Sequence, residues 1–250
     1  MADRFTVRAP LAPLLTDARI AGALTSQLLA GEVVSLVDGR GDWLRVRAAD
    51  EYEGWTHVGY LMPFTGTERT WRWSLGCVVR EAHGSARLLP LGARLTPTSI
   101  VEQGEAIAAA AAAARFPRNA AAIAESALTV FSGAGYLWGG VTPWGADCSG
   151  FVQRIFQLHG VSLPRDAWQQ EAALSLVEEN AAAAHAPADL LFFSDREDRR
   201  VTHVGISLGD GRMAHSSLVR GGFALERMDA GDPYIARLRA QCVGIRRVAI

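Results

Sequence analysis

Lysine is absent from the sequence, so all 25 basic residues are arginine, set against 26 acidic residues. This absence excludes mechanisms that depend on a lysine Schiff base or on the lysine of a phosphate-binding P-loop. The formal net charge of −1 also argues against nucleic acid or an anionic membrane as the main partner, because binding to phosphate groups needs clustered positive charge. We therefore expect neither of these partners.

Cysteine is scarce as well. Cys77, Cys148 and Cys242 are far apart and odd in number, so they do not make a disulfide framework for a chain of this size. No Cys-x-x-Cys pair predicts structural zinc. At least one thiol is left free, which favours a reducing compartment.

Long hydrophobic runs are missing too. The N-terminus lacks a basic start followed by an unbroken apolar run, because Leu11–Leu15 is interrupted by Pro13, so we predict no signal peptide. The longest apolar stretch, Ala106–Ala114, is nearly all alanine and too short to span a bilayer. The expected localisation is cytoplasmic.

The composition that remains is that of an ordinary globular protein. The chain has 250 residues, of which 49% are hydrophobic and 20% charged, which excludes disordered, coiled-coil and collagen-like classes. Its length allows one large domain or two to three small ones.

The first part of the chain is rich in short apolar runs separated by turn residues. Val33–Val37, a turn over 38–42 and Trp43–Arg47 predict a hairpin. With a further strand around Gly54–Thr56, residues 1–65 are interpreted as a small antiparallel barrel. Residues 66–117 are expected to hold a second small β module and a linker, with a helix or linker over Glu105–Arg115.

Residues 118–250 mix helix and sheet, which indicates an α+β arrangement. A helix is predicted over Asn119–Val130 with Asn119 as its N-cap. A second, amphipathic helix is predicted with Cys148 in its first turn and Gly160 just beyond its end. Three strands are predicted further on, at Leu190–Phe193, Val201–Leu208 and Met213–Ser217.

Cys148 is the leading candidate for a nucleophile. A helix N-terminus stabilises a thiolate, so the position is expected to lower the thiol pKa from its free value of about 8.5. The alternative is that this cysteine is a small buried hydrophobic residue.

His203 supplies a possible base. Val204, Ile206 and Leu208 share one face of its strand, so His203 points to the other face. A nucleophile paired with an imidazole is what acyl transfer requires.

His215 follows in the next strand and could orient His203. A two-residue turn at Asp210 and Gly211 would place the two histidines on opposite faces, whereas an odd loop or a bulge would place them on the same face. The sequence leaves this register open.

Several short motifs resemble those of the NlpC-type cell-wall peptidases, which are papain-like cysteine enzymes. They are Tyr136-Leu137-Trp138-Gly139-Gly140, Asp147-Cys148-Ser149-Gly150-Phe151, Leu163-Pro164-Arg165-Asp166, Thr202-His203-Val204-Gly205-Ile206 and Ala214-His215-Ser216. The preceding segment, with Tyr52-Glu53-Gly54-Trp55, resembles the bacterial Src-homology-3-like barrels that accompany γ-D-glutamyl-L-diamino acid endopeptidases. The resemblance implies a papain-like fold, in which the helix bearing the cysteine packs on an antiparallel sheet, after one or two small β-barrels.

Carried over residue by residue, the resemblance implies Cys148 as the nucleophile, His203 as the general base and His215 as the orienting residue. It implies that Tyr136 helps to hold the carbonyl oxygen of the substrate. Further substrate contacts are implied for Asp147, Ser149 and Asp166.

The barrel is implied to read the free amine of an N-terminal L-Ala through a tyrosine and an acidic side chain. Tyr52 with either Asp17 or Glu32 would supply these groups, although all three are equally compatible with ordinary barrel surface. One departure concerns Ala167, where close members of the family usually have serine, so one substrate hydrogen bond is in doubt.

The expected function is a cysteine endopeptidase that cleaves the γ-D-glutamyl-diaminopimelate bond of free murein peptides during cell-wall peptide recycling. The alternatives are a catalytically inactive peptidoglycan-binding protein and a papain-like amidase or acyltransferase. No cofactor is expected, because the glycines around Gly135 lack the spacing of a dinucleotide loop. No metal is expected either, because no close ligand pair anchors Cys148, His203 and His215.

Overall fold

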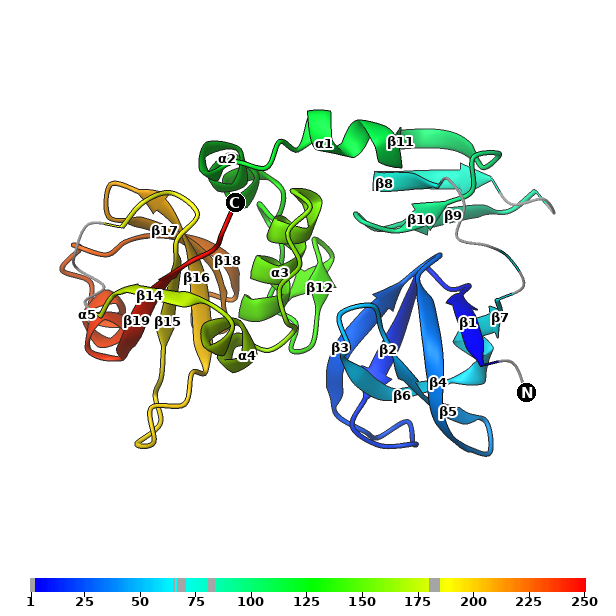
Figure 1. Cartoon of the computed structure of the whole chain (residues 1–250), viewed down its shortest axis with the longest axis horizontal. Helices are drawn as coiled ribbons and strands as arrows, with labels where there is room; N and C mark the ends of the chain where they lie inside the picture. Colours follow the sequence, from blue (N-terminus) through cyan, green and yellow to red (C-terminus); the bar gives the residue numbers. More distant parts are fainter. Residues whose placement is uncertain (1–2, 65, 67–70, 81–83, 180–184) are drawn as a thin grey trace. The chain divides into compact units, whose positions relative to one another are not determined.

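The computed structural model describes residues 3–64, 66, 71–80, 84–179 and 185–250. The chain divides into two compact units, Met1–Arg115 and Phe116–Ile250, and each is described here by itself (Figure 1).

The first unit begins with a seven-stranded antiparallel sheet in the order β3-β2-β6-β5-β4-β1-β7. In β5, Leu44 and Val46 are buried whereas Arg45 and Arg47 are exposed, so side-chain alternation builds the core on one face. The predicted hairpin is confirmed, with its turn after Arg40. The elements are β1 (Arg4–Val7), β2 (Leu11–Leu15), β3 (Leu24–Leu29), β4 (Val33–Arg40), β5 (Trp43–Arg47), β6 (Glu53–His57), the 3₁₀ turn η1 (Val58–Tyr60) and β7 (Leu61–Pro63).

A second, smaller sheet completes this unit, in the order β10-β8-β11 with β9 also paired to β8. Its elements are β8 (Arg72–Arg80), β9 (Ala86–Leu89), β10 (Arg94–Leu95), β11 (Ile100–Ala108), the 3₁₀ turn η2 (Ala109–Ala111) and α1 (Ala112–Arg115). The expectation of a helix or linker over Glu105–Arg115 is wrong for its first four residues, because β11 continues to Ala108, where it still pairs with Arg72. Pairing with β8 overrides the helix propensity of alanine.

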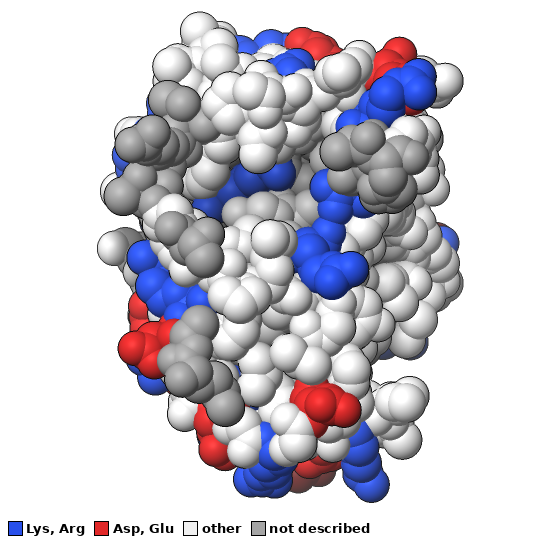
Figure 2. Space-filling view, turned by 90° about the vertical axis from the view of Figure 1, so that its right-hand side faces the viewer, with Lys and Arg blue, Asp and Glu red and all other residues white. Residues whose placement is uncertain are grey.

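The surface in Figure 2 carries both arginine and acidic side chains, and much of it is uncharged. This mixture agrees with a net charge close to zero.

The second unit is built on a six-stranded antiparallel sheet in the order β14-β19-β15-β16-β17-β18. A two-stranded hairpin, β12 with β13, stands apart from it. The strands are β12 (Val141–Thr142), β13 (Gly145–Ala146), β14 (Ser175–Glu178), β15 (Leu190–Phe193), β16 (His203–Gly209), β17 (Arg212–Ser217), β18 (Gly222–Arg227) and β19 (Cys242–Arg247). The three strands predicted in this region are confirmed, whereas β12, β13, β14, β18 and β19 had not been predicted.

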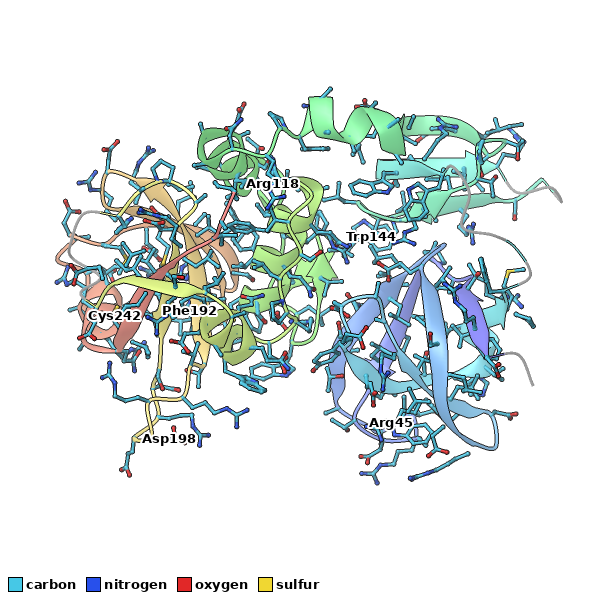
Figure 3. All side chains as sticks on the ribbon, in the orientation of Figure 1. Arg45, Arg118, Trp144, Phe192, Asp198 and Cys242 are labelled. Atoms are coloured by element: carbon cyan, nitrogen blue, oxygen red, sulfur yellow. The ribbon has the colours of Figure 1, made fainter. Side chains whose placement is uncertain are left out.

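Helices flank this sheet (Figure 1). They are α2 (Ala120–Thr129), α3 (Cys148–Leu158), α4 (Ala167–Ala172) and α5 (Pro233–Ala240). Helix α3 packs against β16 and β17, whereas Ile235 and Leu238 of α5 join a buried cluster with Leu191, Phe193 and Met213. Figure 3 marks Phe192 in the sheet and Asp198 far out on the loop between β15 and β16.

The predicted helix boundaries in this unit are confirmed. Asn119 caps α2, its side chain accepting from the Ala122 N–H at 2.9 Å, and α3 begins at Cys148. Gly160 follows α3 with a φ of +71°, a conformation that glycine adopts without strain. Together these elements give the predicted α+β arrangement, with the cysteine helix on an antiparallel sheet. Among the described residues, no helix has the length and hydropathy needed to cross a membrane.

Candidate active site

Cys148 is the first residue of α3, and the turn that carries it is tightly fixed. Asp147 is the N-cap, and its Oδ1 accepts from the Gly150 N–H at 2.7 Å. A Cβ on Gly150 would lie 2.2 Å from the Gly140 carbonyl oxygen, so only glycine fits there. The capping geometry therefore holds the thiol at the start of the helix.

Arg165 lies beneath this turn with only 1% of its side chain exposed. Its guanidinium donates to both carboxylate oxygens of Asp147, at 3.0 and 2.7 Å, and to Ser149 Oγ at 2.9 Å. The Gly139 N–H donates to the same carboxylate at 2.8 Å. The buried charges are thus paired in the bidentate geometry that arginine favours. The sequence had not singled out Arg165, although it lies next to Asp166 in the quoted motif.

The residues predicted to contact the substrate in this region are held by other parts of the protein. Asp147 and Ser149 are both buried in the Arg165 network. Asp166 is the N-cap of α4, and its backbone N–H donates to Gln169 Oε1 at 3.2 Å. Ala167 is buried as the first residue of that helix. Contacts of these side chains with a substrate stay predictions.

The two histidines lie on the same face of the sheet. His203 Nε2 and His215 Nδ1 are 2.8 Å apart, which is a hydrogen bond. Strand β16 pairs with β17 at Ser207↔Met213 and then at Gly209↔Arg212, so one residue, Leu208, is inserted. This β-bulge is one of the two arrangements that could bring the histidines together.

Glu226, which the sequence had not indicated, lies beyond His215. Its Oε1 is 3.7 Å from His215 Nε2, and Arg220 binds the carboxylate from the other side. It was missed because β18 itself was not predicted.

Cys148 of α3 lies against the start of β16. The thiol accepts a backbone hydrogen bond from Val204, the residue after His203. Burial raises the pKa of the Cys148 thiol to about 12, with the Asp147 charge adding to the effect and hydrogen bonds from Val204 and Ser149 opposing it. The expectation of a lowered thiol pKa is therefore wrong for the free protein, because burial outweighs the helix N-terminus.

The pKa of His203 is shifted in the opposite direction to that of Cys148. Burial and the neighbouring His215 lower its pKa well below 6.5, so the imidazole is neutral at physiological pH and able to accept a proton. A protonated thiol near a neutral His203 imidazole can perform nucleophilic acyl transfer by general-base catalysis.

Residues 133–237 match the family model described as "NlpC/P60 family". The second unit carries an NlpC/P60 domain. Residues 14–59 match a second model, described as "Bacterial dipeptidyl-peptidase Sh3 domain", so the first unit carries the SH3 domain that the sequence resemblance predicted.

Two named relatives and one solved structure illustrate the similarity. A γ-D-glutamyl-L-lysine dipeptidyl-peptidase of Bacillus subtilis is 45% identical over 87 residues, which are 34% of this chain and 28% of that protein. A protein of the same name from Bacillus cereus is 26% identical over 239 residues, covering 78% of this chain and 68% of that protein. The crystal structure of an NlpC/P60 family protein from B. cereus aligns with a TM-score of 0.78 at 20% identity, covering 98% of this chain and 99% of that one.

Tyr136 lies close enough to Cys148 and Asp147 for their charges to act on its phenol. Burial, followed by the charges of Cys148 and Asp147, raises the pKa of its phenol above 10. The phenol therefore stays protonated and can donate a hydrogen bond.

The three predicted amine-reading residues lie in the SH3 domain, where each has local contacts. Tyr52 packs partly buried against the barrel core. Asp17 is exposed and pairs with Arg19 at 3.4 Å. Glu32 Oε2 accepts from the Leu29 N–H at 2.9 Å in the turn before β4. Their role in binding an amine stays a prediction.

Across the described parts of both domains, no cluster of three or more His, Cys, Asp or Glu side chains is arranged to hold a metal ion.

Proposed function

We propose that the protein is a cysteine endopeptidase that cleaves the γ-D-glutamyl-diamino acid bond of free murein peptides bearing an N-terminal L-Ala. The observation that carries the proposal is the arrangement of a helix-terminal thiol beside a strand whose first residue, His203, is hydrogen-bonded to His215 at 2.8 Å.

The pKa values favour attack with simultaneous proton transfer over a preformed thiolate-imidazolium pair. The Cys148 thiol, whose pKa is about 12, is protonated in the resting enzyme, and the His203 imidazole is neutral. As the sulfur bonds to the γ-carbonyl carbon, His203 takes the thiol proton. The resulting imidazolium then gives this proton to the amine of the diamino acid as the C–N bond breaks.

The second half of the reaction hydrolyses the acyl-enzyme. The thioester joins Cys148 to the γ-carbonyl of the L-Ala-D-Glu fragment. His203 takes a proton from water, the oxygen bonds to the carbonyl carbon, and the C–S bond breaks. The thiol then regains its proton, and free L-Ala-D-Glu leaves.

Two donors near the nucleophile are suited to the oxyanion of each tetrahedral intermediate. The Cys148 backbone N–H lies at the start of α3, where amides lack partners within the helix. The Tyr136 phenol, kept protonated by its raised pKa, is the second. Fixed donors of this kind stabilise the charge that develops in the transition state.

Support for the substrate comes from the comparisons. The two Bacillus relatives are named for γ-D-glutamyl-L-lysine, so L-lysine joins diaminopimelate as a candidate third residue. The matched SH3 model is described as that of a bacterial dipeptidyl-peptidase, which supports the release of a dipeptide. The amine-reading role of Tyr52 with Asp17 or Glu32 belongs to this proposal, as do recycling and the cytoplasmic location.

The test is mass spectrometry of L-Ala-γ-D-Glu-diaminopimelate and L-Ala-γ-D-Glu-L-Lys, each free and N-acetylated, after incubation with the full chain. We expect release of L-Ala-D-Glu from at least one free peptide and little cleavage of its acetylated form. Cys148→Ala should abolish release. The matched control is Cys242→Ala, which removes another buried thiol of the same unit and should leave turnover unchanged.

Each failure has a distinct meaning. Turnover by Cys148→Ala would refute the nucleophile, whereas equal cleavage of the free and acetylated peptides would refute only amine reading. An intact free peptide after incubation with the wild-type protein would refute the proposed substrate.

A further inference from the structure

The carboxylate of Glu226 is a buried charge that the mechanism above leaves without a use. Its side chain is only 10% exposed, and burying a carboxylate is costly unless it is paired. Its neighbours are the innermost histidine of the site and one arginine.

The sheet register places Glu226 beside His215. His215 pairs with Ala224 across β17 and β18. Glu226, two residues further along, points to the same face and lies diagonally across from the histidine, within reach of a long side chain.

His215 has a buried ring nitrogen that the Glu226 carboxylate is placed to satisfy. Its side chain is fully buried, and within the described structure its Nε2 has no hydrogen-bond partner. The Glu226 oxygen at 3.7 Å is within ion-pair range, and a small rotation would close the gap to a hydrogen bond.

Arg220 holds the carboxylate in place. Its Nε and Nη2 donate to the two Glu226 oxygens at 2.7 and 3.3 Å. The guanidinium also lies 4.7 Å from the centre of the Tyr234 ring and 3.3 Å from Asp232. Burial would raise the pKa of Glu226, but the contacts with His215 and Arg220 outweigh it and lower that pKa, so the carboxylate is ionised at physiological pH.

We infer that Glu226 is a positioning residue that fixes the tautomer of His215 and, through it, the working nitrogen of His203. The inference rests on the proposed function. An anion next to Nε2 requires the proton of neutral His215 to be on that nitrogen, which leaves Nδ1 as an acceptor. His203 must then donate from its Nε2, so its Nδ1 is the nitrogen left to take the thiol proton.

The opposite tautomer would disable the base. If His215 carried its proton on Nδ1, it would donate to His203 Nε2, and the proton of neutral His203 would occupy Nδ1. That nitrogen could no longer accept the proton of Cys148. Glu226 also places a negative charge near the imidazolium that forms on His203 during attack, which stabilises it.

The experiment compares Glu226→Gln and Glu226→Asp with the wild-type chain on the free tripeptide. Losing the charge-assisted contact with His215 should lower kcat of Glu226→Gln by about 10- to 100-fold, with KM little changed because Glu226 is placed behind His215 and not against the substrate. Glu226→Asp keeps the charge and should recover part of the loss. The matched control is Glu171→Gln, which removes a carboxylate paired with Arg246 in the same unit and should retain wild-type kcat.

A pH profile separates positioning from a structural effect. The charged and titratable groups around the histidine pair are Cys148 from α3, Tyr234 from α5, and Glu226 and Arg220 from β18 and the turn before it. Removing the Glu226 charge makes the His203 imidazolium less stable, so the acid limb of kcat/KM should move to lower pH. A partly misfolded variant would have a lower kcat/KM at every pH, but the acid limb of its profile would stay at the same pH.

A second readout does not depend on the substrate. Nitrogen-15 NMR of labelled histidine should show the Nε2–H tautomer of His215 in the wild-type protein and a change in Glu226→Gln. An Nδ1–H tautomer in the wild type, or a Glu226→Gln variant with wild-type kcat and acid limb, would overturn the inference. A Glu226→Gln variant with wild-type kinetics would leave the proposed function intact. Failure of the wild-type protein to cleave any tripeptide would count against the proposed function alone, because the NMR measurement would still decide the tautomer.

Discussion

Replacing Arg165 with methionine should destabilise the turn that carries Cys148. The change removes the buried partner of Asp147 and leaves the carboxylate inside the protein, a situation that typically costs 3–5 kcal/mol. The N–H groups of Gly139 and Gly150 still donate to this carboxylate, so we expect the lower end, about 3 kcal/mol. The double variant with Asp147→Asn should lose less than the sum of the single changes.

The measurement is hydrogen exchange of α3 amides in the full chain, followed by mass spectrometry. A loss of about 3 kcal/mol corresponds to roughly 100-fold faster exchange where exchange follows the opening equilibrium. Arg196→Met is the matched control, because it breaks an exposed pair with Asp198, and exposed pairs contribute little to stability. Exchange of α3 in Arg165→Met that equals that in Arg196→Met would refute the reasoning.

Three further predictions follow from the site. Because the pKa of His203 lies well below 6.5, the acid limb of kcat/KM should fall below pH 6.5, and a limb at or above that value would contradict the assignment of this base. Alkylation of Cys148 by iodoacetamide in the free protein should rise by about tenfold per pH unit from neutral pH toward its pKa of about 12; a rate that levels off near neutral pH would show a preformed thiolate. Gly150→Ala places a methyl group against the Gly140 carbonyl and should cost about 2–3 kcal/mol of unfolding free energy in urea, whereas Gly231→Ala, in open space, should stay within about 0.5 kcal/mol.

Much of the site was predictable because its elements carry strong local signals. Apolar residues recur at helical spacing after Cys148, and Gly160 marks the end of that helix. The alternation of apolar with small or polar residues after His203 is typical of a strand. The presence of both histidines in neighbouring strands followed from the same pattern. Their common face did not, because a single inserted residue, Leu208, decides it, and no sequence pattern marks a bulge.

Other features depend on packing between distant segments. The raised pKa of Cys148 comes first from burial, which the helix sequence alone does not contain. Glu226 and Arg165 become important only through partners in other elements, His215 and Asp147. The stretch Gly222–Arg227 is only partly buried. The alternation of apolar and polar residues along it is therefore weak, and strand β18 was not predicted.

The bulge at Leu208 also indicates which changes in chain length would displace His215. Deleting Leu208 itself would make the pairing regular, with Ile206 still opposite Ala214, so His215 would stay on its face of the sheet. Deleting Ala214 from β17 would instead bring His215 opposite Ile206 and turn it to the other face. The site would then lose this histidine although none of its side chains had been altered.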